Sequence, residues 1–191
     1  MKLTKKLFIS VLLVGVMIPQ ALSDTITAEL IFTKRPPFSG VLYVLDDKNN
    51  LSTITVDQKD TQFTKKLQVS ALGQNITFNN SDEVDHNIFA NNTKINAVFD
   101  VGLMTPGSTA EIELSWQKNS LARIGCKIHP RMRAYIANIT SNYYQVLPFE
   151  KKVKAYQVTI NDVPSNLTSL NLLMPGYKIM QFQLIFIKIS S

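Results

Sequence analysis

The chain contains very few of the residues that form disulfide, zinc and iron–sulfur sites. Its 191 residues include one cysteine and two histidines. A single cysteine excludes an internal disulfide framework and any site that requires four cysteine ligands. Seven glycines and eight prolines are too few for a low-complexity chain, and 45% hydrophobic with 18% charged residues are sufficient for a packed core. We therefore expect a folded protein of one domain or slightly more.

The sequence also lacks an apolar run that is long enough to cross a bilayer comfortably. The run Leu7–Ile18 follows three lysines and precedes small residues at Ala21 and Ser23, which is the layout of a secretory signal peptide cleaved after Ser23. The alternative is an uncleaved N-terminal anchor. We predict a signal peptide at residues 1–23, export to the periplasm and no membrane span after cleavage. Removal of the signal lowers the formal charge from +6 to +3, an excess too small to favour nucleic acid as a partner.

Short β-forming runs separated by polar turns dominate the rest of the chain. In Ala110–Leu114 the apolar side chains alternate with Glu111 and Glu113, which is typical of a strand with one buried and one solvated face. No segment shows the 3.6-residue apolar period and the caps of a long helix. The predicted fold class is all-β, an antiparallel sandwich or barrel. The expected strands are Ile26–Thr33, Gly40–Leu45, Phe63–Val69, Asn75–Phe78, Ala110–Leu114, Ala122–Cys126 and Met132–Ile136.

A domain boundary is expected near Ser141. Residues 24–140 are predicted to form one domain, and residues 141–191 a C-terminal β extension or a small appended β unit. The sequence shows neither an internal repeat nor a flexible linker between the two parts. The strands expected in the extension are Val153–Ile160, Leu167–Met174 and Tyr177–Ile189.

The chemically reactive side chains lie in one short stretch, Cys126-Lys-Ile-His129-Pro-Arg-Met132, together with a single upstream histidine, His86. An exported chain leaves Cys126 without a cysteine to pair with, so burial, a disulfide to another protein or a metal must account for the thiol. One cysteine, two histidines and a weak axial methionine are the ligand type of a type 1 copper centre. The two residues between successive donors allow the loop side chains to converge, while His86 comes from a different strand.

Two neighbouring residues are expected to support these ligands. The side-chain amide of Asn87 can bond the ligand loop and hold it in place, and Pro130 removes a backbone donor and stiffens the loop. Lys127, Arg131 and Arg133 surround the loop, where they form either a solvated rim or a docking surface for an acidic partner.

Other interpretations of the same residues stay open at this point. Cys126 can be an inert buried thiol, His86 a turn histidine and Met132 an ordinary core residue. Glu83 or Asp85 can supply an oxygen ligand and make a copper site that is not blue. A zinc site leaves the methionine without a role, a cysteine–histidine nucleophile lacks an oxyanion device, and two histidines are too few for a multicopper oxidase.

Four runs carry a resemblance to a known family: Val56-Asp-Gln, Gln74–Asn87, Phe99–Met104 and Arg123–Ile136. In these runs the sequence resembles the cupredoxins. More narrowly, it is similar to secreted plastocyanin-like proteins often labelled methylamine utilisation proteins, and its short ligand loop is similar to that of amicyanin. The resemblance covers about residues 55–140. It implies a Greek-key β-sandwich that holds one copper ion through His86, Cys126, His129 and Met132.

The function expected from these features is that of a periplasmic, mononuclear type 1 copper protein that carries single electrons and is not an enzyme. Cys126 is then the strong covalent ligand, His86 the buried imidazole, His129 the solvent-facing imidazole through which electrons pass, and Met132 the axial ligand. The same ligands fit a second role, a copper carrier that delivers copper without redox turnover. Redox proteins are the expected partners, and the basic loop favours an acidic one. We expect the protein to act as a monomer.

Overall fold

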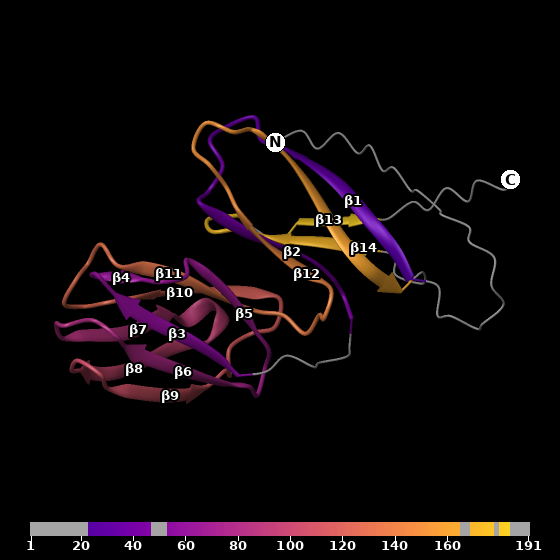
Figure 1. Cartoon of the computed structure of the whole chain (residues 1–191). Coiled ribbons are helices and arrows are strands. Elements are labelled where there is room, and N and C mark those ends of the chain that lie inside the picture. The colour runs from indigo at the N-terminus through magenta and orange to yellow at the C-terminus, as the bar shows by residue number, and fades with distance from the viewer. Residues whose placement is uncertain (1–22, 47–52, 165–168, 178–179, 184–191) are drawn as a thin grey trace, which may run out of the picture.

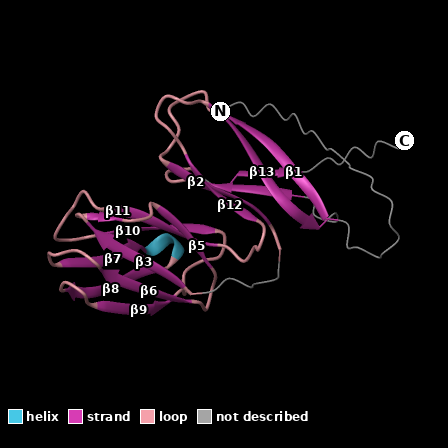
Figure 2. Ribbon diagram, viewed as in Figure 1, coloured by secondary structure: helices cyan, strands magenta, loops and turns pink. Residues whose placement is uncertain are grey.

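The computed structural model describes residues 23–46, 53–164, 169–177 and 180–183. Within these residues, all regular structure is β-strand apart from one 3-10 turn at Thr93–Ile95 (Figure 2). The predicted all-β fold class is therefore confirmed. The strands are β1 (Ser23–Ile31), β2 (Ser39–Val44), β3 (Ile54–Lys59), β4 (Gln62–Phe63), β5 (Leu67–Ser70), β6 (Asn75–Asn80), β7 (His86–Asn92), β8 (Ala97–Met104), β9 (Thr109–Glu113), β10 (Ser120–Gly125), β11 (Arg133–Asn138), β12 (Tyr144–Pro148), β13 (Ala155–Pro164), β14 (Ser169–Leu173) and β15 (Met180–Gln183).

Strands β3 to β11 form a two-sheet sandwich, which we call the inner sandwich (Figure 1). One sheet has the strand order β5-β11-β10-β7-β8, and the other has the order β4-β3-β6-β9. Because side chains alternate along a strand, each sheet turns one set of apolar residues toward the other. Ile76 and Phe78 of β6 thus lie in the same core cluster as Ile88 of β7 and Ile124 of β10.

Two strand pairs of the inner sandwich are parallel, whereas the sequence predicted only antiparallel pairing. β11 runs parallel to β5, and β3 runs parallel to β6. β5 belongs to one sheet, whereas β3 and β6 belong to the other. After β3 the chain therefore crosses to the opposite sheet, forms β5, and crosses back to form β6, which runs in the same direction as β3. This crossing joins the two sheets covalently as well as through their shared core.

The remaining strands form a second β-structure, which we call the outer unit. β1 pairs with β13, and β2 lies between β12 and β14 in the sheet β12-β2-β14-β15. The outer unit has its own core, to which Leu30, Leu42, Val158 and Leu172 contribute. The sequence analysis assigned residues 24–46 to the same domain as the candidate ligands. In the structure, the two strands of this segment, β1 and β2, pair with the C-terminal strands β12, β13 and β14. Alternation predicts which face of a strand is buried, but it does not select the partner strand.

The inner sandwich and the outer unit meet in a hydrophobic contact. Val41 and Tyr43 of β2 pack in one cluster with Leu67 of β5 and Ala137 of β11. The Tyr43 hydroxyl donates a hydrogen bond of 3.2 Å to Asn119 Oδ1 of the inner sandwich. Burial raises the pKa of Tyr43 above its ordinary range, so this hydroxyl stays protonated. These contacts hold the outer unit against the β5–β11 side of the inner sandwich.

The β10–β11 hairpin separates the two ends of the inner sandwich. Ser120 pairs with Asn138 at one end of the hairpin, and Gly125 pairs with Arg133 at the other. From Asn138 the chain continues to the outer unit, whereas the Gly125 end carries the loop 126–132. The predicted ligand loop is therefore at the end of the hairpin that points away from the connection to the outer unit.

Some expectations fall outside the described residues. They are the signal peptide except for Ser23, which begins β1, residues 167–168 of the expected strand Leu167–Met174, and residues 178–179 and 184–189 of the last expected strand. Within the described part of the chain, no helix has the length and hydropathy needed to cross a bilayer.

The close packing between β2 and β14 leads to a stability prediction at Gly40. A Cβ atom at this position would lie 2.9 Å from Met174 Cγ and 3.1 Å from the backbone oxygen of Leu173. We therefore expect Gly40→Ala to lower the free energy of unfolding by about 1–3 kcal/mol through overpacking, as measured by urea denaturation. Thr159→Ala on the exposed side of β13 is the control and should change stability by less than about 0.5 kcal/mol. Equal stability of both variants would contradict the packing described for Gly40.

Candidate metal centre

The loop between β10 and β11 brings two donor side chains close together. Cys126 follows the last residue of β10 and is a free, buried cysteine. The backbone N–H of His129 donates to Cys126 Sγ at 3.4 Å, and the backbone N–H of Met132 donates to the His129 carbonyl at 2.9 Å. These two bonds fold the loop into a compact turn, so that the thiol and the His129 ring lie on the same side of it.

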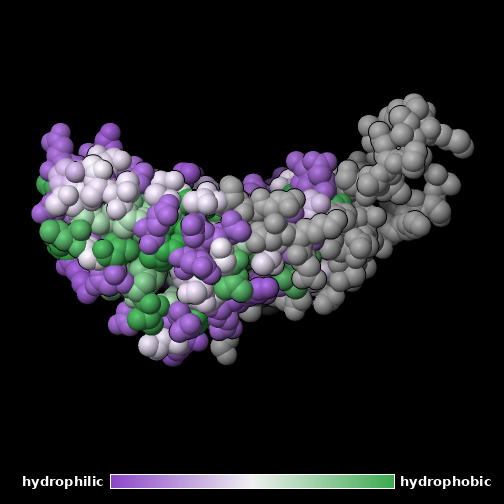
Figure 3. Space-filling view, turned by 90° about the horizontal axis from the view of Figure 1, so that it is seen from below, coloured by the Kyte–Doolittle hydropathy of each residue, from purple (hydrophilic) through white to green (hydrophobic). Residues whose placement is uncertain are grey.

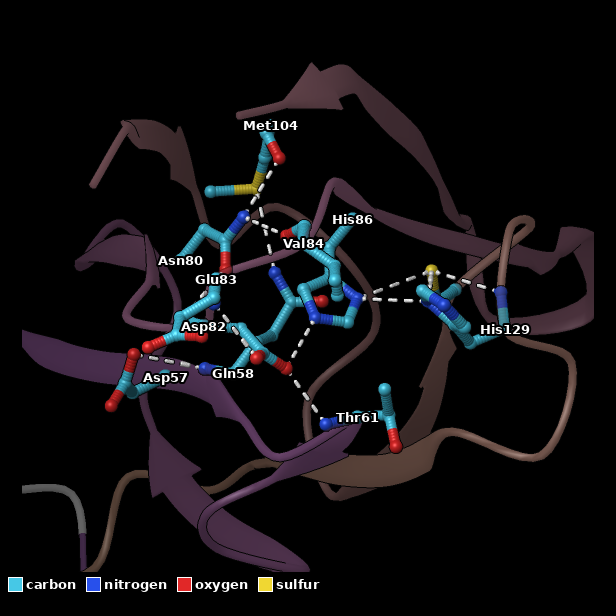
Figure 4. Close-up of polar contacts among 11 residues, drawn as sticks. Asp57, Gln58, Thr61, Asn80, Asp82, Glu83, Val84, His86, Met104 and His129 are labelled. Atoms are coloured by element: carbon cyan, nitrogen blue, oxygen red, sulfur yellow. Dashed lines mark hydrogen bonds and ion pairs between the residues drawn. The ribbon is translucent and has the colours of Figure 1, made fainter. Parts of the chain in front are cut away.

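The third donor comes from the first residue of β7. His86 is fully buried, and its Nδ1 atom lies 3.9 Å from Cys126 Sγ and 3.1 Å from His129 Nδ1. The distance from Cys126 Sγ to His129 Nδ1 is also 3.9 Å. Figure 4 shows the His86 and His129 rings facing one another, with the two nitrogen atoms and the sulfur atom linked by dashed lines. Three potential ligand atoms from distant parts of the sequence thus converge on one point.

The size of this triangle can be compared with the size of a metal ion. A circle through three atoms separated by 3.1, 3.9 and 3.9 Å has a radius of about 2.1 Å. Bonds from a zinc-sized ion to imidazole nitrogen and thiolate sulfur are about 2.0–2.1 and about 2.3 Å long. The spacing of the three atoms therefore suits a first-row transition metal, which His86, Cys126 and His129 could hold without large displacement.

The fourth predicted ligand, Met132, is not part of this group of three. It is buried and belongs to the same core cluster as Cys126. The acidic alternatives, Glu83 and Asp85, are exposed, and among the described residues the convergent group contains only His86, Cys126 and His129. The structure thus brings three of the four predicted residues into one group and places the fourth in the core cluster that also contains Cys126.

A residue that the sequence analysis did not single out contacts the buried histidine. Asp82 Oδ2 lies 2.9 Å from His86 Nε2, on the side of the ring opposite the nitrogen that faces Cys126 (Figure 4). Asp82 also accepts hydrogen bonds from the backbone N–H groups of Thr61, at 2.7 Å, and Glu83, at 2.8 Å. The Thr61 bond, followed by the His86 bond, lowers the pKa of Asp82 to about 2, so this side chain is a carboxylate at neutral pH.

Asn87 supports the loop in the way that the sequence suggested. Its Oδ1 atom accepts a hydrogen bond of 3.3 Å from the backbone N–H of Lys127, the residue after Cys126. Its Nδ2 atom donates to Asp100 Oδ1 at 2.6 Å and to the Gly102 carbonyl at 3.0 Å. The amide therefore ties the loop to β8 across β7.

Lys127 forms a second tie between the loop and β8. Its Nζ atom lies 2.5 Å from Asp100 Oδ2 and 5.6 Å from the centre of the Phe89 ring. The Lys127 bond, together with the backbone N–H of Gly102 and the Asn87 amide, lowers the pKa of Asp100 to about 2. Asp100 balances the charge of Lys127, and no ion pair involves Arg131 or Arg133 within the described residues, so these two arginines carry the net positive charge around the loop.

The surface near the loop mixes charged and apolar side chains. Ile128 of the loop, Val84 of the turn before β7, and Leu103 near the end of β8 that pairs with His86 and Asn87 are all exposed. In the space-filling view, hydrophobic groups interrupt the hydrophilic surface of the inner sandwich (Figure 3). His129 is partly exposed, whereas the other two potential donors are buried.

Comparison with known proteins finds similarity in structure only. No protein-family model matches the chain, and no curated protein matches it in sequence. A copper-containing nitrite reductase from Thermus scotoductus SA-01 is similar with 20% identity and a TM-score of 0.40, over 47% of this chain but only 22% of that chain. A purple cupredoxin from Nitrosopumilus maritimus is 15% identical with a TM-score of 0.37, over 47% of this chain and 99% of that chain. An amicyanin mutant in its Cu(I) form is 13% identical with a TM-score of 0.38, over 51% and 97% of the two chains. Two of the three, the purple cupredoxin and the amicyanin, carry the names of proteins that the sequence resembles.

The Lys127–Asp100 pair leads to a pH prediction. The pKa of Asp100 in the folded protein, about 2, lies below its ordinary value of 3.8. The contacts of Asp100 therefore stabilise the fold fully above about pH 4, and this stabilisation is lost as the pH falls toward 2. In the metal-free protein, Lys127→Met should raise the Asp100 pKa toward 3.8, as measured by NMR titration of the carboxyl carbon. Arg131→Met, which removes an exposed charge from the same loop, should leave this pKa unchanged, and an equal shift in both variants would refute the pairing.

Proposed function

We propose that this chain is a periplasmic, mononuclear copper protein that carries single electrons between redox proteins. In this proposal the ion is held by His86, Cys126 and His129, with Met132 as a weak axial ligand. The observation that carries it is the convergence of two Nδ1 atoms and one Sγ atom on a point about 2.1 Å from each.

The donor set supports copper over zinc. A thiolate, two imidazoles and a thioether are the ligands of type 1 copper sites. Structural zinc sites use four cysteine, histidine or carboxylate ligands in a tetrahedron, and no described carboxylate joins the group around Cys126. A zinc ion would therefore leave Met132, a neutral soft sulfur, without a function.

The scaffold supports electron transfer. Copper bound at this point would supply a one-electron couple between Cu(II) and Cu(I). His86 is locked at the start of β7 by Asp82, and the loop is locked to β8 by Asn87 and Lys127. A donor set that is held this firmly moves little when the charge at its centre changes by one, which keeps the barrier to electron transfer low.

The exposure of the donors suggests how electrons enter and leave. His129 is the one member of the group that is partly exposed, so a partner that docks on the loop would come closest to the ion through this ring. Arg131 and Arg133 are exposed beside it and favour a partner with an acidic docking surface. In this proposal the protein acts as a monomer, transfers electrons and transforms no substrate.

The thiolate gives a direct test of the proposal. Addition of Cu(II) to the mature protein should produce an intense visible sulfur-to-copper charge-transfer band and a matching paramagnetic resonance spectrum. Cys126→Ser should abolish the band while near-ultraviolet circular dichroism shows an unchanged fold. Wild-type protein that binds copper tightly without any intense visible band would refute a type 1 centre.

The axial role of Met132 has a separate test, because a methionine in this place also packs the core. Met132→Leu keeps the volume and the apolar character of the side chain but removes the thioether, which donates more to Cu(II) than to Cu(I). The reduction potential should therefore rise. The matched control is Met174→Leu, at a methionine that is equally buried but belongs to the core of the outer unit, and it should leave the potential unchanged. The same small effect in both variants would mean that Met132 is only a core residue.

A further inference from the structure

We propose that Asp82 is a positioning residue that selects the tautomer of His86 and lowers the reduction potential of the centre. This inference rests on the proposed copper site, and it goes beyond it by assigning the control of the potential to a residue that does not bind the ion. It is carried by three observations: the contact of Asp82 with His86, the rigid hold on Asp82, and the absence of a similar contact at His129.

The contact determines which ring nitrogen of His86 is free. A neutral imidazole carries one proton, and a carboxylate can only accept a hydrogen bond. Because Asp82 Oδ2 lies 2.9 Å from His86 Nε2, the proton must be on Nε2. The lone pair of Nδ1 then points at Cys126 Sγ and His129 Nδ1, which is the protonation state that a metal ligand requires.

Asp82 is itself held by the backbone. The N–H of Thr61, in the turn between β3 and β4, donates to the same Oδ2 atom that faces His86. The N–H of Glu83 donates to Oδ1, and the N–H of Asp82 donates to Asn80 Oδ1. The carboxylate therefore cannot rotate away from the ring without breaking hydrogen bonds to two separate segments. A side chain in this position gives a permanent orientation to the imidazole.

The negative charge of Asp82 acts on the ion through a buried ring. The side chain of His86 is 0% exposed and that of Asp82 is 11% exposed, so water screens their interaction weakly. A carboxylate bonded to Nε2 makes the imidazole a stronger donor at Nδ1. The doubly charged state of the ion benefits more than the singly charged state, so the oxidised form is stabilised and the reduction potential falls.

The second imidazole lacks such a partner. Within the described part of the chain, the ring of His129 contacts Cys126 and His86 through Nδ1 and has no carboxylate on its other nitrogen. The centre is therefore asymmetric, with the buried ring bonded to a charge and the partly exposed ring facing the surface. This asymmetry makes Asp82 the residue through which the protein sets the potential, independently of the docking surface.

The experiment compares two variants that each remove one negative charge from the same turn. Asp82→Asn keeps the shape of the side chain and an acceptor oxygen, and Glu83→Gln changes the exposed neighbour, whose side chain makes no contact with His86. We expect Asp82→Asn to lower the ratio of Cu(II) affinity to Cu(I) affinity by about tenfold or more, which corresponds to a rise of about 59 mV in the one-electron potential. Glu83→Gln should change the ratio less than about twofold, since its charge is exposed to solvent. Equal shifts in the two variants, or no shift in Asp82→Asn, would overturn the proposal.

A second measurement keeps the test independent of copper binding. Nitrogen-15 NMR of the metal-free wild-type protein reports which nitrogen of His86 carries the proton. We expect protonation at Nε2 in the wild type and a mixture of tautomers in Asp82→Ala. A wild-type proton on Nδ1 refutes the inference even if Asp82 variants do not fold. Failure of the wild type to give a type 1 copper spectrum refutes the proposed function instead, and the tautomer result still decides the role of Asp82.

Discussion

The pairing of β7 with β10 is the constraint on which the proposed site depends, because it joins the two segments that carry the donors. Gly125 lies opposite Phe89 in this pair, and a Cβ atom on Gly125 would come within 3.3 Å of the Phe89 ring and 3.5 Å of the Met132 carbonyl. A side chain at this position would require the Phe89 ring to shift by a few tenths of an ångström, so glycine favours the close approach of β10 to β7 immediately before Cys126. The distance of 3.9 Å between Cys126 Sγ and His86 Nδ1 follows from that approach.

The β-strands and the three candidate metal ligands could be predicted from the sequence for different reasons. Alternation in runs such as Ala110–Leu114 reports one buried face whatever the partner strand is, so the all-β class follows from local pattern. The donors Cys126, His86 and His129 were predictable because the chain offers so few side chains of their kind. Strand partners are not a local property. The pairing of β1 with β13 joins residues more than a hundred positions apart, and no feature of either strand selects the other.

The polar contacts around the donors were only partly predictable. Asn87 follows a donor directly, so its role could be anticipated from its place in the chain, and its bond to the Lys127 N–H agrees. Asp82 is one of three acidic residues in the turn before His86, and nothing in the sequence separates it from Glu83 and Asp85. The choice is made by the fold, because the Thr61 N–H from another hairpin binds Asp82 and orients it. Contacts that depend on two turns meeting in space are not encoded in the pattern of either turn.

The insertion of the inner sandwich into the outer unit has a mechanical consequence. The chain leaves the outer unit after β2 and returns to it at β12, and these two strands are hydrogen-bonded neighbours, with Tyr43 opposite Tyr144. A pull applied to β1 and β15 at the ends of the described chain is therefore borne first by the ladders of the outer unit. Tension between these two strands reaches the inner sandwich only after β2 and β12 separate, so stretching the outer unit in this way would leave the spacing of the three potential donor atoms unchanged.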